Sequence, residues 1–115
     1  LISIVSIILL TELTSNTASA STFIPILGAT ALGLGQNPLL LIIPATLGAS
    51  CAFMMPVATP PNTIAYASGH LKISDMIKAG IWLNIISIII IGIIITLILG
   101  PVFDVELNKI PLWVK

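Results

Sequence analysis

A short polar stretch decides how this chain folds: Thr11-Glu12-Leu13-Thr14-Ser15-Asn16-Thr17, set between two apolar runs near the start of the sequence. A second break, Pro56-Val57-Ala58-Thr59-Pro60-Pro61-Asn62, divides what would otherwise be one long apolar segment. In a membrane, backbone that leaves the helix must be buried in protein or line a water-filled cavity, because lipid offers no hydrogen bonds. Two such breaks therefore predict one internal site built from helix ends.

The composition is that of a membrane protein. Of the 115 residues, 57% are hydrophobic and only 7% are charged, whereas soluble domains carry about 25% charged residues. No Asp, Glu, Lys or Arg occurs from Leu13 to Leu71, and a soluble domain of this length would need charged surface there. The formal net charge of zero argues against nucleic acid as a partner. The single Cys51 excludes an internal disulfide.

The chain begins with Leu1 inside an apolar run, and no positively charged segment precedes that run. This argues against a secretory signal peptide, and we expect an internal or C-terminal piece of a longer protein, or a processed product. No nucleophile–base pair, phosphate-binding loop or metal-ligand spacing occurs in the sequence. An enzyme is therefore not expected.

The first polar break predicts a helical hairpin. The first apolar run continues helically to about Thr14, and Ser15 or Asn16 can cap the start of a second helix. That helix covers about Ala18 to Leu32 and is rich in small residues, which allow membrane helices to approach closely. Pro25 is expected to kink it or to end its first part. We predict a re-entrant hairpin whose tip lies at mid-depth in the membrane.

The second break predicts a broken helix, which one full span follows. Leu39 to Met55 is apolar and stops at Pro56, and a short helix is expected from about Thr63 to Ser68. Ala79 to Leu99 is uncharged, and its roughly 31 Å suffice to cross a hydrocarbon core of about 30 Å. Gly100-Pro101 is expected to end this helix. The predicted parts are the hairpin at 1–33, the broken helix at 38–69, the transmembrane helix at 79–100 and a tail at 101–115.

Basic residues give the predicted orientation. Lys72 and Lys78 lie on one side of the last span, so the positive-inside rule places the loop at 70–78 in the cytoplasm and the C-terminus outside. Trp82 and Trp113 fit anchors at the membrane–water interfaces. The predicted fold class is an all-α membrane protein that crosses the cell (inner) membrane several times.

The two breaks offer helix ends of opposite electrostatic character. Free N–H groups and the positive end of the dipole make the helix start after Ser15 a site for an anion. Unsatisfied carbonyls at the end of the preceding helix, from Thr11 to Thr14, suit a hard cation. The same holds around Ala58, where Pro60 and Pro61 remove competing N–H donors. Neutral oxygens favour a weakly held alkali ion over a divalent metal, which usually recruits carboxylates.

Two alternatives stay open at this point. The Ser-Asn-Thr sequence at 15–17 can simply cap a buried helix. Glu12 is the only ionisable side chain in the apolar region before position 70. It is either part of an ion path or a proton acceptor, or it faces a polar partner in a part of the protein outside this chain.

The two breaks together resemble those of the divalent anion/sodium symporter family. The resemblance lies in TELTSNTA at residues 11–18 and CAFMMPVATPPN at residues 51–62, in that order and in an apolar setting, and it covers nearly the whole chain. In that family, two inverted repeats each carry a re-entrant hairpin with a Ser-Asn-Thr tip and a broken helix. Members are homodimers that carry di- and tricarboxylates or sulfate, usually with sodium, by an elevator-like movement of the transport domain.

The resemblance implies two sets of site residues in the second repeat. The implied substrate-binding residues are Ser15, Asn16, Thr17, Thr59 and Pro60. The implied sodium-binding residues are Thr11, Ser15, Asn16 and Ala58. No cofactor besides the coupling sodium ion is implied, and the chain lacks the first repeat, so that alone it would hold half a pocket.

The function expected from these observations is the C-terminal portion of a secondary active, sodium-coupled transporter of di- or tricarboxylates or a similar divalent anion. The expected partners are that anion, sodium, the lipid bilayer, the missing N-terminal repeat and, for the complete protein, a second copy of itself. The alternative is a non-transporting helical membrane subunit or a component of a pore.

Overall fold

The computed structural model describes residues 1–103, and within that range it consists of helices without any strand. This confirms the predicted all-helical class. Residues beyond Phe103, including Trp113 and most of the predicted tail, lie outside the described part. The helices are α1 (Ile2–Thr11), α2 (Asn16–Gly33), α3 (Leu39–Ala49), α4 (Pro60–Ala67) and α5 (Ile73–Phe103).

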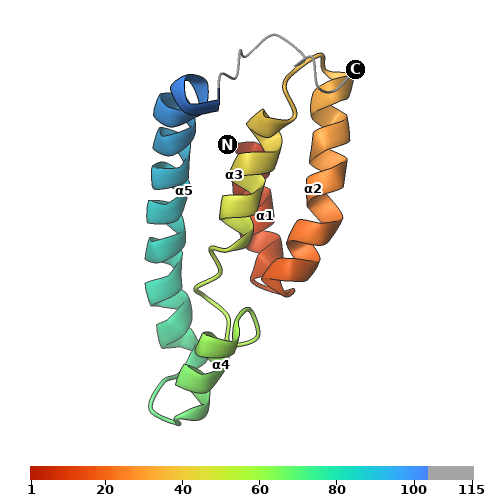
Figure 1. Cartoon of the computed structure of the whole chain (residues 1–115). Coiled ribbons are helices and arrows are strands. Elements are labelled where there is room, and N and C mark those ends of the chain that lie inside the picture. Colours follow the sequence, from red (N-terminus) through yellow and green to blue (C-terminus); the bar gives the residue numbers. More distant parts are fainter. Residues whose placement is uncertain (104–115) are drawn as a thin grey trace.

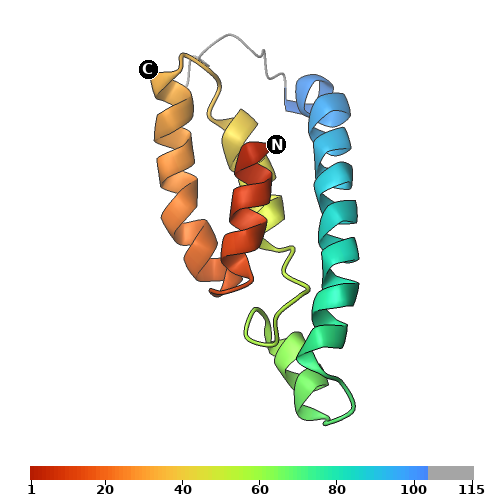
Figure 2. The same cartoon turned by 180° about the vertical axis from the view of Figure 1, so that it is seen from behind.

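The helices α1 and α2 form an antiparallel hairpin, and α1 and α3 together lie between α2 and α5 (Figures 1 and 2). After α3 the chain leaves the helix for residues 50–59 and continues in the same direction to α4 at one end of the molecule. The long α5 then returns along α3 (Figure 1). The tip of the hairpin, residues 12–15, thus lies on the same side as the non-helical segment 50–59.

Small residues on α3 allow the central helix to pack closely against α1. A Cβ added at Gly48 would lie 2.8 Å from Cγ2 of Ile7, which is too close for any larger residue. Ala45 and Ala49 are buried with Ile7 in one apolar cluster, and Phe23 of α2 packs against it. A second cluster joins α1 to α5. The helices α2 and α5 are therefore held on opposite sides of the pair α1 and α3.

The helix α5 has the length and composition of a membrane span. Its 31 residues extend over about 46 Å, and only 11% of its most apolar window is buried inside the structure. The core helix of a soluble protein would be mostly buried. Large apolar side chains such as Trp82 and Leu97, each 68% exposed, instead require apolar surroundings outside the described residues.

The last helix extends beyond the predicted span at both ends. It begins at Ile73, six residues before the uncharged run that starts at Ala79, and Asp75 in its first turn suits the positive end of the helix dipole. The absence of charged residues predicts which part of the helix is apolar, but it does not predict where the helix starts. Pro101 lies inside the last turns instead of ending α5 at Gly100.

The bounds around the two breaks also needed correction. The helix α2 starts at Asn16 and is continuous through Pro25, which neither ends it nor divides it. The helix α3 ends at Ala49, well before Met55. The short helix begins at Pro60 rather than Thr63, since proline suits the first turn of a helix, where its missing N–H would have no partner anyway.

Candidate functional site

The hairpin tip presents the start of α2 in a capped form. Ser15 has extended backbone (φ −69°, ψ 144°), and its Oγ accepts a hydrogen bond of 3.1 Å from the backbone N–H of Ala18. This is the usual geometry of an N-cap serine. Among residues 1–103, no acceptor faces the backbone N–H groups of Asn16 and Thr17. Two donors at the positive end of the helix dipole therefore remain open.

A fully buried threonine fixes the side chain of Asn16. The hydroxyl of Thr11, at the end of α1, lies 2.7 Å from Oδ1 of Asn16 and 3.1 Å from the carbonyl oxygen of Ala49. The single hydroxyl proton can serve one of these acceptors at a time. The contact with Ala49 brings the C-terminal ends of α1 and α3 together beside the start of α2, so the negative ends of two helix dipoles lie close to the hairpin tip.

The second break ends in the capped start of α4. Thr59 is the N-cap, and its Oγ1 accepts a hydrogen bond of 3.3 Å from the N–H of Asn62. Pro60 and Pro61 occupy the first turn and have no N–H. The start of α4 therefore contributes the positive end of a dipole but no free backbone donor before Asn62. The first turn of α4 thus offers an anion fewer N–H donors than the hairpin tip does.

The side chain of Asn62 closes the non-helical segment into a compact loop. Its Nδ2 donates hydrogen bonds of 3.1 Å to the carbonyl oxygen of Ala52 and of 3.0 Å to that of Met55. The Thr63 hydroxyl donates to the carbonyl oxygen of Pro56 at 2.6 Å. Two neighbouring residues of α4 thus bind three carbonyls of the break and determine its shape.

The hairpin tip and the second break line one cavity of about 630 Å³. None of the side chains that line it is charged. Of the residues expected from the sequence, six line this cavity, and Thr11 lies buried beside Asn16. The lining residues are Ser15, Asn16, Thr17, Ser50, Ala52, Phe53, Ala58, Thr59, Pro60, Pro61 and Asn62.

Glu12 does not line this cavity but lies behind its wall, where it is 2% exposed. Its carboxylate accepts hydrogen bonds from the backbone N–H groups of residues 53–55 and from the Asn84 side chain. The interpretation that Glu12 faces a partner outside this chain is therefore wrong, because its partners lie within it. The same hydrogen bonds also explain why α3 ends early. The backbone N–H groups of residues 53–55 donate to Glu12, so they cannot donate to the carbonyls of a continued helix.

Sequence reasoning missed several residues of this region. Ser50, Ala52 and Phe53 were expected inside a helix, so nothing pointed to them as cavity walls. Asn84 did carry a signal, since it is the only amide side chain in the apolar run from Ala79 to Leu99. A buried amide at that position needs a hydrogen-bond partner, and the partner is Glu12 at 2.8 Å.

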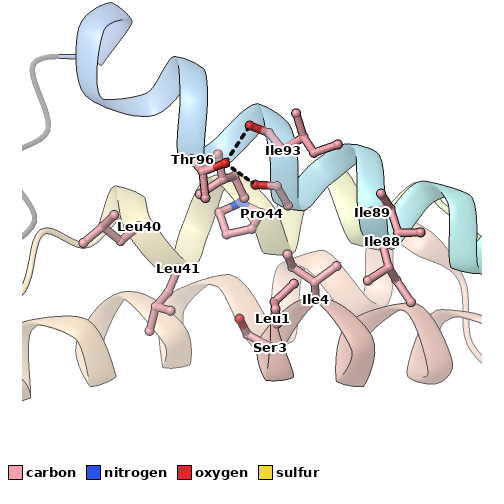
Figure 3. Close-up of a pocket in the computed structure, with 12 residues that line it drawn as sticks. Leu1, Ser3, Ile4, Leu40, Leu41, Pro44, Ile88, Ile89, Ile93 and Thr96 are labelled. Atoms are coloured by element: carbon pink, nitrogen blue, oxygen red, sulfur yellow. Dashed lines mark hydrogen bonds between the residues drawn. The ribbon is translucent and has the colours of Figure 1, made fainter.

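A second cavity, of about 570 Å³, lies between α1, α3 and α5 and has a different character (Figure 3). Leucine and isoleucine side chains make up most of its wall. The Thr96 hydroxyl bonds to carbonyls of its own helix, at Gly92 and Ile93 (Figure 3). The first residues of α1 also line this space, but its wall contributes few polar side chains. The polar cavity at the hairpin tip is therefore the better candidate for binding charged solutes.

Comparison with known proteins identifies the family of the chain. Residues 1–103 match the family described as sodium:sulfate symporter transmembrane region. The sodium-dependent dicarboxylate transporter SdcS of Staphylococcus saprophyticus is 39% identical over 103 residues, which are 90% of this chain and 20% of that protein. The protein of the same name from Staphylococcus aureus (strain MRSA252) is 44% identical over 99 residues, which are 86% of this chain and 19% of that protein. The chain thus spans about a fifth of the length of these curated relatives.

Proposed function

The chain belongs to the sodium:sulfate symporter family, and we propose that it forms the C-terminal part of the transport domain of a sodium-coupled transporter of di- or tricarboxylates or a similar divalent anion. The family and the two relatives are transporters rather than enzymes, and the chain is a membrane protein. The observation that carries the proposal is the uncharged cavity between the start of α2 and the second break. The wall that the described residues form offers helix ends, rather than charged side chains, to bind ions.

The anion is proposed to bind at the start of α2. The open N–H groups of Asn16 and Thr17 point from the positive end of a helix of 18 residues, an arrangement that suits carboxylate or sulfate oxygens. The hydroxyls of Ser15 and Thr17 add neutral polar groups. Thr59 and Pro60 face the same cavity from the start of α4, whose dipole favours the same charge.

The sodium ion is proposed to bind beside the anion, at the C-terminal ends of α1 and α3. The side chains of Thr11, Ser15 and Asn16 and the backbone around Ala58 supply neutral oxygens there, and Ala58 is 4% exposed. Such ligands suit a weakly bound hard cation. A cation and an anion in one uncharged cavity stabilise each other, which explains how transport of the two is coupled.

We further propose that the hairpin of α1 and α2 is re-entrant and that α3, the segment 50–59 and α4 form one broken helix. The complete protein would add a first repeat, which closes the other half of the pocket, and would form a homodimer in the cell (inner) membrane. The segment at 70–78, which includes the first residues of α5, would lie in the cytoplasm and the C-terminus on the outer side, as the positions of Lys72 and Lys78 indicate.

The proposal is tested by sodium-driven uptake of succinate into vesicles that contain the complete transporter. We expect Asn16→Ala to abolish uptake, because it removes the amide that α1 positions in the cavity. The matched control is Gln36→Ala, which removes an amide in the turn that follows the opposite end of α2. Uptake at the wild-type rate by Asn16→Ala would contradict the assignment.

A thermal-shift measurement on the complete protein distinguishes the transporter from a non-transporting subunit or pore component. Sodium and a dianion such as succinate, citrate or sulfate should stabilise the transporter together, and either alone should do so less. A membrane subunit without this site would show no stabilisation that depends on both solutes.

A further inference from the structure

The carboxylate of Glu12 binds three consecutive backbone N–H groups of the second break. Its Oε1 accepts from Phe53 at 2.8 Å, and its Oε2 accepts from Met55 at 2.9 Å. The N–H of Met54 lies within 3.1 Å of both oxygens. Hydrogen bonds between a buried carboxylate and N–H donors are shorter and stronger than those between neutral groups. This segment is therefore held to the hairpin by its backbone, whatever its side chains are.

Hydrogen bonds connect the backbone of residues 53–55 to the wall of the cavity. The carbonyl oxygen of Met55 accepts hydrogen bonds from the N–H of Ala58 at 3.2 Å and from Nδ2 of Asn62 at 3.0 Å. Both of these residues line the cavity, and Phe53, which donates to Glu12, lines it as well. A displacement of residues 53–55 would thus shift the cavity wall around Ala58.

Thr11, the residue before Glu12, holds the opposite wall of the cavity, at the hairpin tip. The Thr11 hydroxyl lies 2.7 Å from Oδ1 of Asn16 at the hairpin tip. Thr11 and Glu12 are adjacent at the end of α1, so one end of one helix fixes both walls of the cavity relative to each other. The distance between the tip and the Ala58 backbone depends on these two buried side chains.

The helix α5 supports this arrangement from behind. Nδ2 of Asn84 donates a hydrogen bond of 2.8 Å to Oε1 of Glu12. One turn earlier, Gly80 lets α5 approach the backbone of Phe53 and Met54. Positions 80 and 84 lie on the same face of the helix, and this face contacts both the carboxylate and the backbone that the carboxylate binds.

We propose that Glu12 is a positioning residue, which sets the sodium site by holding the 53–55 backbone at a fixed distance from the hairpin tip, and that Asn84 orients its carboxylate. Neither side chain contacts the ion. The inference rests on the proposed function, because it assigns the sodium ion to the cavity. Loss of groups that orient metal ligands typically weakens metal affinity by about 10- to 100-fold, and we expect this range for Glu12→Gln.

The test uses the complete transporter, purified and reconstituted, with uptake normalised to folded protein. Glu12→Gln places an amide NH₂ against backbone N–H donors, and it should raise the sodium concentration for half-maximal uptake by about 10- to 100-fold. Asn84→Leu removes only the orienting donor and should raise it less. The matched control is Asp75→Asn, the same change of carboxylate to amide at an exposed position of α5. It should leave the sodium dependence unchanged.

A second readout reports the 53–55 backbone directly. Cys51 is half-buried and precedes this segment, so its alkylation by N-ethylmaleimide can be followed in a transporter without other cysteines. Alkylation should be faster in Glu12→Gln and in Asn84→Leu than in Asp75→Asn. If Glu12→Gln yields no folded protein, Asn84→Leu decides the question by the same two measurements.

The outcomes separate this inference from the proposed function. Reduced folded yield with unchanged sodium dependence and unchanged alkylation would show that Glu12 stabilises the fold without setting the site, which overturns the inference. If the wild-type protein takes up no dianion with sodium, the proposed function fails. The alkylation rates would then still decide whether Glu12 holds the 53–55 backbone.

Discussion

Replacement of Gly80 by Ala should drive α5 and the second break apart. A Cβ added at Gly80 would lie 2.6 Å from Cα of Met54 and 2.6 Å from the carbonyl oxygen of Phe53. Ordinary contacts begin at 3.4 Å, so the shortfall is 0.8 Å. The atoms in the way belong to the backbone and cannot rotate aside. Either α5 moves outward or the backbone moves toward the cavity, and both changes strain the hydrogen bonds of Glu12.

The cost of this substitution follows from overpacking. A methyl group forced into a well-packed site typically costs about 1–3 kcal/mol. The change from Gly to Ala also favours the helix by up to about 1 kcal/mol, which partly hides that cost. Gly92→Ala is the matched control, because it gains the same helix preference on the same helix. Its Cβ would meet only the Leu1 side chain, at an ordinary 3.5 Å.

The assay compares the unfolding free energies of the two variants of the complete transporter in detergent. We expect Gly80→Ala to be less stable than Gly92→Ala by about 1–3 kcal/mol, since the shared helix preference cancels. Gly80→Ala should also require more sodium for half-maximal uptake, because the Ala58 backbone is displaced. Equal stability of the two variants would refute the reasoning, as it would show that α5 does not contact the break closely.

Two further predictions concern the walls of the cavity. Thr17→Ala should weaken succinate binding by about tenfold or more, because a hydrogen bond to a charged group is lost, and should affect sodium less; equilibrium binding assays that show the reverse order would remove Thr17 from the anion site. Asn62→Leu should destabilise the complete transporter by about 1–3 kcal/mol, because the buried carbonyl oxygen of Ala52 loses its donor. Thermal unfolding checks this against Tyr66→Phe on the same helix, and equal stability of the two would show that Asn62 does not hold the break.

Local chemistry was sufficient to place the N-cap of α2 at the first break. Ser15 is a strong N-cap residue, and its side chain does cap α2. The small residues of the neighbouring helices and the uncharged run from Ala79 to Leu99 were enough to predict an all-helical membrane protein. The signal for the start of α4 was also present, since Pro60 and Pro61 suit the first turn, but we interpreted them only as helix breakers.

The end of α3 could not be predicted from nearby residues. Residues 50–55 are mostly apolar and follow a helix without any strong terminating signal before Pro56. The cause lies about forty positions earlier in the chain, where Glu12 provides a carboxylate for three backbone N–H groups. Because Glu12 is distant in the sequence, the residues near the end of α3 do not show that it binds their backbone N–H groups. For the same reason the sequence pointed to Ala58 but not to Phe53 as part of the cavity.

The hydrogen bonds of Glu12 also determine where this part of the protein can bend. A hinge between the hairpin and α5 would have to separate Glu12 from Asn84 inside apolar surroundings, where no water replaces the lost bond. The link from Ser68 to Leu71 is exposed and has a left-handed Gly69 (φ +77°), but Asn62 and Thr63 bind α4 to the break, so α4 cannot turn there without losing those hydrogen bonds. The tip, the break, α4 and the Gly80–Asn84 turn should therefore move as one unit.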